Sequence, residues 1–403
     1  MNRFDFPAIT AFPGVYLDTA ATAHKPALVI QAMSDWYTRD YASVHRGFYA
    51  YAERATTRYE QIRSEVAQWI SAQDSSEVVF TRGATESINM IVHCWARAII
   101  APGDEIVITA LEHHANQLPW EALARERGLR VRSIPVYGDA LQFDLSTIPS
   151  YFSEKTRLFA FCSSSNIIGA VPPAVRDTLI AAARSVGAAI CIDAAQTVAH
   201  ERVDVRLWDP DFMVFSGHKM YGPTGIGVLY IAGRRHTEIR PATYGGGMVV
   251  QAGIQEPVWK GMPHLLEAGT PPIGAAMGLQ AAIAYLSTID YQALQKREAM
   301  LTKQLLTGLV EIPGIRILGD QRYMQQNGSM VSFSIAGIHP HDIAHHLALH
   351  GICVRSGDHC CQRLHTALGL SGTVRASIGM YTTESDIAQC IAAVTEAYHL
   401  LRV

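Results

Sequence analysis

The chain has 403 residues, of which 49% are hydrophobic and 17% are charged, and its formal net charge is −3. This length allows two domains with a large core, and the charge balance offers no basic surface for a nucleic acid or an anionic membrane. No apolar run reaches the roughly 18 residues of a membrane span, and residues 1–7 lack the apolar core of a signal peptide, so we expect a cytoplasmic protein. The seven cysteines have no regular spacing and are expected as thiols, and we expect no metal site.

Short apolar segments alternate with segments of helical periodicity through the middle of the chain. The segments predicted as strands are 77–80, 105–109, 158–162, 188–192, 212–215 and 226–231, and helices are predicted over 120–128 and 176–187. This alternation is typical of an α/β fold in which a mainly parallel sheet carries helices on both faces.

A second, smaller α/β domain is predicted near the C-terminus. Residues 245–272 contain several glycines and prolines and are predicted as an irregular active-site loop, and one long helical stretch over 274–309 follows. Beyond it, 330–335 and 352–354 are predicted as strands, and helices are expected from His341 and Thr383 onward.

Polar side chains follow five of the predicted strands, at 81–85, 112–116, 165–166, 193–196 and 216–219. In open α/β sheets, ligands bind beyond the carboxyl ends of the strands. We therefore expect these five segments to form one site.

Lys219 is the most informative residue of this set, because it ends a buried apolar run and lies within the segment Ser216-Gly-His-Lys-Met-Tyr-Gly222. A lysine at the end of a buried strand is costly unless it has a partner, and a covalent bond to an aldehyde cofactor supplies one. The alternative is a surface lysine in a glycine-rich turn.

Three other positions suit a phosphorylated pyridine cofactor, each with a plainer alternative. Gly83-Ala84-Thr85 precedes a helical segment, where free amides bind phosphate; the alternative is a simple helix cap by Thr85. Asp193 could pair with a pyridine nitrogen or cap the segment that follows it. His113 could stack on the cofactor ring or be a loop histidine bound to a backbone carbonyl.

Eight motifs in order give the chain a specific resemblance. They are Tyr16-Leu-Asp-Thr-Ala-Ala21, Thr81-Arg-Gly-Ala-Thr-Glu86, Glu112-His-His-Ala-Asn116, Asp193-Ala-Ala-Gln196, Ser216-Gly-His-Lys219, Glu267-Ala-Gly-Thr-Pro271, Arg355-Ser-Gly-Asp-His-Cys360 and Val374-Arg-Ala-Ser377. With them the chain resembles the group II cysteine desulfurases and selenocysteine lyases of the class V, fold-type I enzymes that use pyridoxal 5′-phosphate (PLP). The resemblance implies a large, mainly parallel seven-stranded sheet domain over 15–275. It also implies a small α/β domain, formed by 1–14 and 276–403, that carries the catalytic cysteine loop.

The resemblance also implies which residues hold PLP. Lys219 is expected to bind it covalently, Asp193 to pair with the pyridinium nitrogen and Gln196 to bond the ring hydroxyl, while His113 stacks on the ring as a further catalytic residue. The other implied cofactor-binding residues are Ala84, Asn166 and the phosphate-binding Thr85, Ser216 and His218. Thr270 is expected to reach the phosphate of the neighbouring subunit, which implies a homodimer.

The substrate side of the implied site contains Asn166 and Arg375, which bind the substrate carboxylate, and Arg355 and His45, which line the sulfur side. Cys360 matches the nucleophile of the family. Since adjacent residues of an extended loop point in opposite directions, we expect Cys360 to face the substrate and Cys361 to be a small packed residue.

The implied reaction converts L-cysteine to L-alanine and leaves the sulfur on Cys360 as a persulfide. A sulfur-acceptor protein then takes the sulfur for iron–sulfur cluster or other cofactor assembly. Two alternatives stay open: a lyase acting on L-selenocysteine or another C–S bond, and a non-enzymatic scaffold. The chain departs from the family at Pro272, at Leu265-Leu266 and at Gly245-Gly-Gly-Met248, which leaves the acceptor and the substrate details open.

Overall fold

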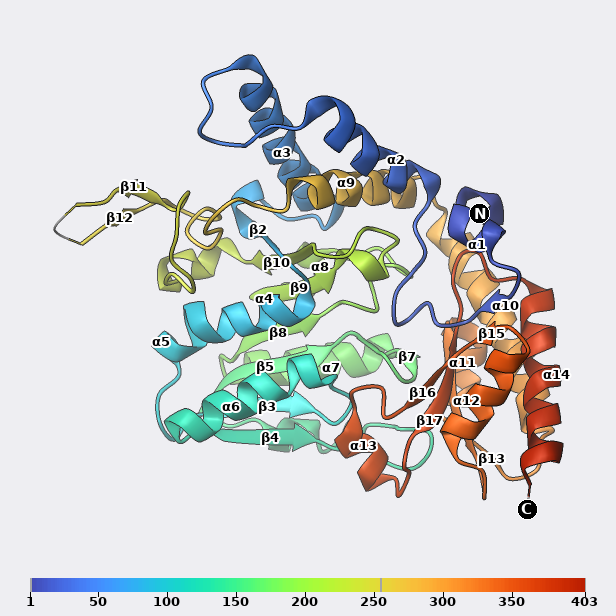
Figure 1. The fold of residues 1–403 in the computed structure, drawn as a ribbon. Coiled ribbons are helices and arrows are strands. Elements are labelled where there is room, and N and C mark those ends of the chain that lie inside the picture. Colours follow the sequence, from blue (N-terminus) through green and yellow to red (C-terminus); the bar gives the residue numbers. More distant parts are fainter. Residues whose placement is uncertain (1, 254–255, 403) are drawn as a thin grey trace.

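The computed structural model describes residues 2–253 and 256–402. Its largest element is a seven-stranded sheet with the strand order β2-β10-β9-β8-β5-β3-β4 (Figure 1). In that order the strands are β2 (Val78–Thr81), β10 (Gly227–Ile231), β9 (Phe212–Ser216), β8 (Ala189–Asp193), β5 (Thr156–Cys162), β3 (Glu105–Thr109) and β4 (Arg130–Ile134). Strand β10 is antiparallel to both of its neighbours, and all other neighbouring pairs are parallel. The mainly parallel seven-stranded sheet expected from the sequence is confirmed.

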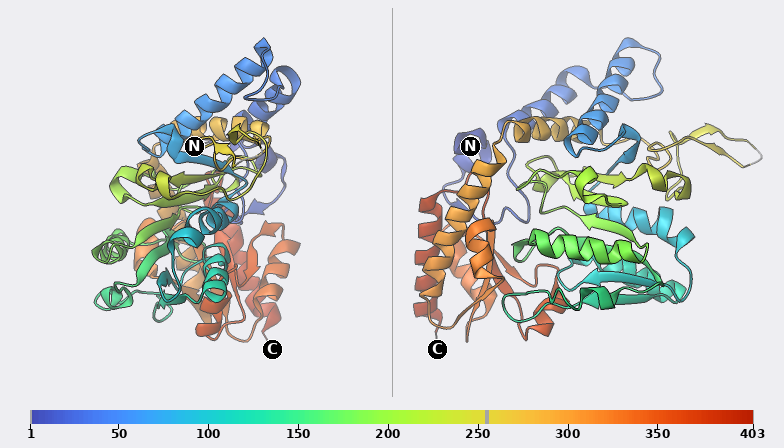
Figure 2. Two further views of the ribbon diagram at one scale, coloured as in Figure 1. Left: turned by 90° about the vertical axis from the view of Figure 1, so that its left-hand side faces the viewer. Right: turned by 180° about the vertical axis from the view of Figure 1, so that it is seen from behind.

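Helices cover both faces of this sheet (Figure 2). Alternate residues of β9 show the division: Met213 and Phe215 pack in one core with α3 (Ala50–Trp69), α7 (Pro173–Ser185) and α9 (Ile273–Ser287). Phe212 and Val214 pack in a second core with α4 (Ala84–Ile91) and α6 (Leu118–Arg127). Because both faces are covered, the strands read as continuous apolar runs in the sequence.

A second sheet lies beside the first, at the right of Figure 1, and has four antiparallel strands in the order β13-β14-β17-β16. These strands are β13 (Ile315–Leu318), β14 (Met330–Ile335), β17 (Thr373–Ser377) and β16 (Arg355–Gly357). They share a separate core with α10 (Tyr291–Val310), α12 (Pro340–Leu349) and α14 (Glu384–Leu401). Near the N-terminus, β1 (Val15–Tyr16) pairs with β15 (Ile352–Cys353), which ties the start of the chain to this unit.

The remaining helices and strands are short. They are α1 (Pro7–Ala11), α2 (Ala27–Asp35), α5 (Arg97–Ile99), α8 (Val205–Trp208), α11 (Gln321–Asn327), α13 (Gln362–Ala367), β6 (Ser164–Ser165), β7 (Gly169–Ala170), β11 (Val249–Gln251) and β12 (Val258–Trp259). Among the residues that the structure describes, no helix is both long enough and apolar enough to cross a membrane. The division of the chain at residue 275 stays a prediction; α9 extends across that position.

The secondary structure differs from the sequence predictions in three places. The helical stretch over 274–309 is two helices, α9 and α10, because the Asp290 side chain accepts hydrogen bonds from the amides of Gln292 and Ala293 and so starts a new helix. The segment 245–272 is not wholly irregular, since β11 and β12 form a hairpin within it. The edge strand β4 was not predicted, because its sequence, Arg-Val-Arg-Ser-Ile, is largely polar.

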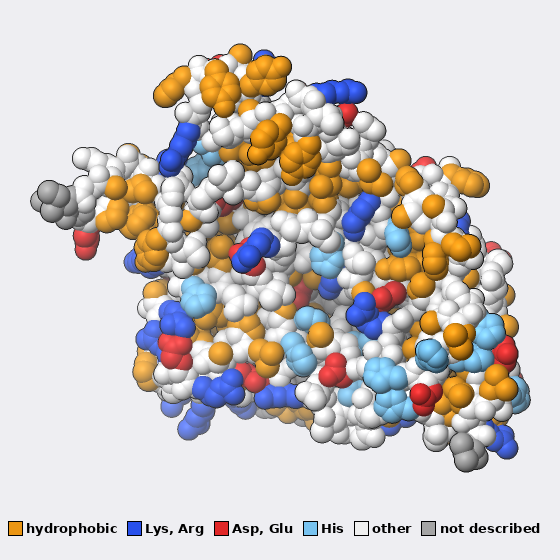
Figure 3. All heavy atoms as spheres, in the orientation of Figure 1, with side chains coloured by type: hydrophobic (Ala, Val, Ile, Leu, Met, Phe, Trp, Pro, Cys, Tyr) orange, Lys and Arg blue, Asp and Glu red, His pale blue; other side chains and the backbone are white. Residues whose placement is uncertain are grey.

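Exposed hydrophobic side chains gather on one part of the surface, over α2, α3 and the arm formed by β11 and β12 (Figure 3). The largest of them are Tyr37, Tyr41, Phe48, Tyr49, Tyr51, Tyr244, Val250 and Val258. The Phe48 side chain is 98% exposed. Clusters of exposed apolar side chains of this kind are typical of surfaces that bind another protein.

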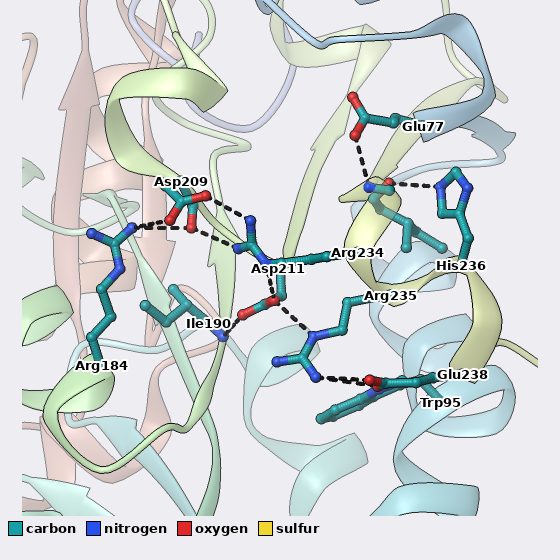
Figure 4. A network of polar contacts seen from close by, with 12 residues as sticks. Glu77, Trp95, Arg184, Ile190, Asp209, Asp211, Arg234, Arg235, His236 and Glu238 are labelled. Atoms are coloured by element: carbon teal, nitrogen blue, oxygen red, sulfur yellow. Dashed lines mark hydrogen bonds and ion pairs between the residues drawn. The ribbon is translucent and has the colours of Figure 1, made fainter.

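A network of ion pairs fixes the amino end of β9 (Figure 4). The buried carboxylate of Asp211 accepts a hydrogen bond from the Ile190 amide at 2.8 Å, and its other oxygen accepts from Arg234 at 2.8 Å and Arg235 at 2.7 Å. Since a buried carboxylate is stable only when its oxygens are paired, these contacts hold β8, β9 and the segment after β10 in one register. Lys219 follows the opposite, carboxyl end of β9.

Candidate active site

A pocket of about 310 Å³ opens where the carboxyl ends of the large sheet face the four-stranded sheet. Segments that follow β2, β3, β5, β8 and β9 line one side of it. The four-stranded sheet and the helices packed on it, here called the small unit, line the other side. The predicted site residues that line it are Ala84, Thr85, His113, Asn166, Asp193, Gln196, Ser216, His218, Lys219, Arg355, Cys360 and Arg375. The structure therefore brings the segments that follow these five strands together around one pocket.

One end of the pocket is a cradle of backbone amides at the start of α4. Gly83 precedes this helix with a φ of 159°, and the Ala84 amide donates to the Ser216 hydroxyl at 2.9 Å. A side chain on Gly227 would approach the Gly83 Cα to 2.4 Å, so the absence of one lets β10 lie directly under the helix start. Amides at a helix N-terminus together with a hydroxyl suit a phosphate group.

Asp193 and Gln196 lie at the base of the pocket and are both buried. The Ala195 amide donates to Asp193 Oδ1 at 2.9 Å, and no donor among the described residues contacts Oδ2. Burial raises the pKa of the Asp193 carboxyl, and the nearby Lys219 ammonium opposes that rise. This carboxylate is therefore suited to a cationic partner inside the pocket.

Lys219 ends a short 3₁₀ turn, Gly217–Lys219, that directly continues β9. Burial lowers the pKa of its amine, and the positive charge of Arg375 lowers it further, while Asp193 and Cys360 act in the opposite direction. A lowered pKa increases the fraction of neutral amine, which is the form that attacks an aldehyde. The alternative of a surface lysine in a glycine-rich turn does not match this position.

His113 lines the pocket with a defined tautomer. Its Nδ1 accepts a hydrogen bond from the Ala115 amide at 3.0 Å, so the proton of the neutral ring is on Nε2. Burial, and secondly the charge of Lys219, lowers its pKa to about 4. His113 is thus a neutral, flat ring at neutral pH, bound to a backbone amide rather than to a carbonyl.

A buried arginine faces the pocket from β17. Arg375 donates from Nη1 to the Asn166 carbonyl at 2.7 Å and from Nη2 to Asp18 at 3.4 Å, and its buried Nε has no partner among the described residues. Arg355 donates to the same Asp18 carboxylate at 2.9 Å. Asp18 belongs to the first motif of the sequence, but its role of orienting two arginines was missed, since only the fold brings residues 18, 355 and 375 together.

The two adjacent cysteines have different surroundings. Cys360 is exposed and lines the pocket, whereas the buried Cys361 donates from Sγ to Asn166 Oδ1 at 3.3 Å and to the Glu112 carbonyl at 3.5 Å. The expected extended loop is wrong: His359 and Cys360 both have left-handed φ angles, of 51° and 58°. This turn still places the Cys360 thiol at the surface of the pocket and the Cys361 thiol in the interior, as an extended loop would have done.

The cysteine loop is held mainly by polar contacts to the large sheet. The side-chain amide of Asn166 donates to the His359 carbonyl at 2.6 Å, and the His114 amide donates to the Cys360 carbonyl at 2.8 Å. Burial lowers the pKa of His359 to about 3, so this ring is neutral and the positive charges acting on Cys360 are those of Arg355 and Lys219.

Glu112 is a buried carboxyl that the sequence analysis did not single out. Burial raises its pKa to about 8, although Thr109 donates to it at 2.6 Å and Asn116 at 2.6 Å. It anchors the backbone between β3 and His113 and accepts from the Cys162 amide at 3.1 Å. Its position directly before His113 in the motif Glu112-His-His-Ala-Asn116 could have identified it as a site residue from the sequence.

Two predicted site residues lie outside the pocket of their own chain. His45 Nε2 donates a hydrogen bond to the Glu60 carboxylate at 2.8 Å, and the His45 ring lies 5.3 Å from that of His264. Thr270 is exposed in the segment that follows Glu267, whose carboxylate pairs with the buried Arg63 at 2.6 Å. The structure therefore does not bring His45 to the sulfur side of the site within one subunit.

Comparison with known proteins agrees with this geometry. The aminotransferase class-V profile matches residues 15–390. A cysteine desulfurase of Pectobacterium carotovorum is 38% identical over 406 residues, covering 99% of this chain and 98% of the relative, and one of Dickeya dadantii is 37% identical.

The chain belongs to the cysteine desulfurases of the class-V aminotransferase family. Two solved structures support this assignment. The cysteine desulfurase CsdA of Escherichia coli superimposes with a TM-score of 0.90 at 38% identity, covering 99% of this chain and 98% of its own. The enzyme of Thermococcus onnurineus gives a TM-score of 0.91 at 35% identity, with coverages of 98% and 96%. Members of the family depend on PLP, and the amide cradle, the Asp193 carboxylate and the Lys219 amine of this pocket fit that cofactor.

We predict that a thiol reagent distinguishes the two neighbouring cysteines. In the native protein, iodoacetamide should alkylate Cys360 rapidly and Cys361 at least about tenfold more slowly, because burial raises the pKa of the Cys361 thiol and covers it. Mass spectrometry of the peptide that contains both, in Cys360→Ser and Cys361→Ala variants, measures each rate. Faster labelling of Cys361 in the Cys360→Ser protein than of Cys360 in the Cys361→Ala protein would contradict the arrangement of the loop.

Proposed function

We propose that the protein is a PLP-dependent cysteine desulfurase that converts L-cysteine to L-alanine and keeps the sulfur as a persulfide on Cys360. The observation that carries this proposal is that the exposed thiol of Cys360 and the amine of Lys219 line one pocket. An enzyme that catalysed only β-elimination or transamination would need no thiol at this position. The same observation argues against a non-enzymatic scaffold.

The roles of the cofactor-binding residues follow from their surroundings. Bound PLP supplies an electron sink that stabilises negative charge at the substrate Cα. Asp193 Oδ2 is available to pair with the protonated ring nitrogen, and the neutral ring of His113 offers a flat surface for stacking. The amides at the start of α4, with Ser216, provide the phosphate seat. Lys219 holds the cofactor and, once released from it, its neutral amine can move the Cα proton.

Arg375 is suited to bind the substrate carboxylate. Its guanidinium is buried, fixed by Asn166 and Asp18, and keeps an Nε without a partner among the described residues. A carboxylate beside a buried guanidinium forms a strong charge-assisted hydrogen bond. Asn166 uses its side-chain amide to hold the cysteine loop, so we assign it the positioning of Cys360 as well as the substrate contact implied by the family.

The sulfur transfer balances without a further reactant. The Cys360 sulfur attacks the substrate sulfur, an S–S bond forms as the C–S bond breaks, and the electron pair of the broken bond stays with carbon and is protonated. L-Cysteine and the Cys360 thiol thus give L-alanine and the Cys360 persulfide. An acceptor protein then takes this sulfur from the exposed loop, which we infer from the exposure of Cys360.

We expect three variants to separate these roles. Lys219→Ala and Cys360→Ser should each lower alanine formation from L-cysteine by about 10²-fold or more, because each removes a reacting group. Cys361→Ala should keep most activity, since its sulfur is buried outside the reaction path. Alanine and sulfide are measured in the presence of a reductant. Full activity of Cys360→Ser with sulfide release would show a lyase that needs no thiol.

We further propose that the enzyme is a homodimer joined through the exposed apolar side chains of α2, α3 and the β11–β12 arm. Twofold dimers are the commonest oligomers. Thr270 is exposed, and the amide of the preceding Gly269 donates to the Gly246 carbonyl, shortly before β11. We therefore infer that Thr270 reaches the site of a partner. This arrangement also gives His45 a place near a site, although it lies outside the pocket of its own chain.

We predict that Phe48→Asp weakens self-association. A charge at this exposed apolar position should shift the protein from twice the chain mass towards a single chain in analytical ultracentrifugation. Leu400→Asp, at an exposed position of α14, is the control and should leave the mass unchanged. A wild-type protein that sediments as a monomer with full activity would refute the dimer.

A further inference from the structure

Two groups of two histidines and a glutamate occur among residues 2–253 and 256–402, each with its ligand atoms within 4.8 Å of one another. In the first, Glu60 already bonds His45 at 2.8 Å through one oxygen and Arg63 at 2.9 Å through the other, so its polar atoms are satisfied. The second group is His346 of α12, His350, which caps the C-terminus of that helix, and Glu396 of α14. It lies in the small unit, outside the pocket, where histidine side chains gather over α12 (Figure 3).

The second group has an unsatisfied centre. His346 is 9% exposed, and its buried Nε2 has no hydrogen-bond partner among the described residues. That nitrogen lies 3.9 Å from Glu396 Oε2, and the Nε2 of His350 lies 3.3 Å from the same oxygen. A buried polar atom without a partner is destabilising, and an ion bound between these three atoms would satisfy His346 Nε2.

The tautomer of His350 is set by the helix itself. Its Nδ1 lies 3.0 Å from the His346 carbonyl, which can only accept, so the proton of the neutral ring is on Nδ1. The lone pair of Nε2 then faces Glu396. Histidine ligands of metals commonly donate their other ring nitrogen to a backbone carbonyl in this way. A lone pair that faces a carboxylate is repelled by it unless a proton or a metal cation lies between the two atoms.

We propose that His346, His350 and Glu396 form a Zn²⁺ site on the small unit, with water as the fourth ligand. His350 follows His346 by four residues at the C-terminal cap of α12, and their rings lie 4.6 Å apart. Two histidines with one glutamate are an established zinc donor set. Bonds of about 2.0–2.1 Å in a tetrahedron place ligand atoms roughly 3.3 Å apart, close to the observed 3.3 and 3.9 Å.

The ion would join α12 to α14. Helix α12 also contacts β16 and β17, which carry Arg355 and Arg375. A bound Zn²⁺ therefore stabilises the small unit behind the active site without taking part in the reaction. The proposal does not depend on the proposed function. It departs from the sequence-based expectation of no metal site, which overlooked the His-x-x-x-His spacing of His346 and His350 at the end of α12.

The test compares Zn²⁺ binding by the PLP-loaded wild type with that of His350→Gln and Glu396→Gln. Both side chains are partly exposed, at 41% and 51%, so these variants should fold, unlike a change at the buried His346. His345→Gln, an exposed histidine on the same helix, is the matched control. Equilibrium dialysis, at a pH above the ordinary histidine pKa of about 6.5, followed by metal analysis counts the ions per chain.

We expect the wild type and His345→Gln to bind one more Zn²⁺ per chain than the other two variants, and their melting temperatures to rise with Zn²⁺ while those of the other two do not. Binding elsewhere, including at Cys360, is common to all four proteins and cancels in the comparison. Equal metal content and equal thermal shifts in the wild type and Glu396→Gln would overturn the proposal. That result would mean that these side chains form only a hydrogen-bonded pair between His350 and Glu396 and bind no metal ion.

Discussion

The arrangement of the site depends on one amine that is partly withdrawn from water. Lys219 directly continues β9, and burial together with the charge of Arg375 lowers the pKa of its amine. Burial raises the pKa of the Asp193 carboxyl, which lies at the end of the neighbouring strand β8. An amine and a carboxylate withdrawn from water are both costly alone, and a cofactor that bonds to the amine and presents a cationic nitrogen to the carboxylate satisfies both.

The position of the reactive thiol depends on a second constraint, the left-handed turn of the cysteine loop. Two successive residues with positive φ cost about 1–3 kcal/mol each, and the contacts around the loop offset this cost. Asp358 accepts from the Cys360 amide at 3.0 Å, and Thr373 contacts the His359 ring at 2.9 Å. Asn166 then joins the loop to the large sheet. The thiol therefore belongs to the small unit, but the large sheet fixes its place.

The sequence predicts much of this arrangement, because the carboxyl ends of parallel strands share one edge. Residues such as Lys219 and Asp193 could be placed in one site from their position after apolar runs. It does not predict the loop around Cys360, since residues other than glycine rarely take positive φ. Nor does it predict that Asp18 orients Arg355 and Arg375, or that His45 lies apart from the pocket, because those contacts join distant segments. The polar edge strand β4 was missed for lack of an apolar pattern.

Lys219 is expected to be the amine that binds the cofactor, and a chemical label shows which lysine is bound. The PLP-loaded protein is reduced with borohydride, digested and mapped by mass spectrometry. The cofactor label is expected on the peptide that contains Lys219. The informative comparison is Lys25, whose amine donates to the His218 carbonyl at 3.1 Å and whose pKa burial lowers to about 8. A label on Lys25 instead of Lys219, or no label at all, would contradict the account.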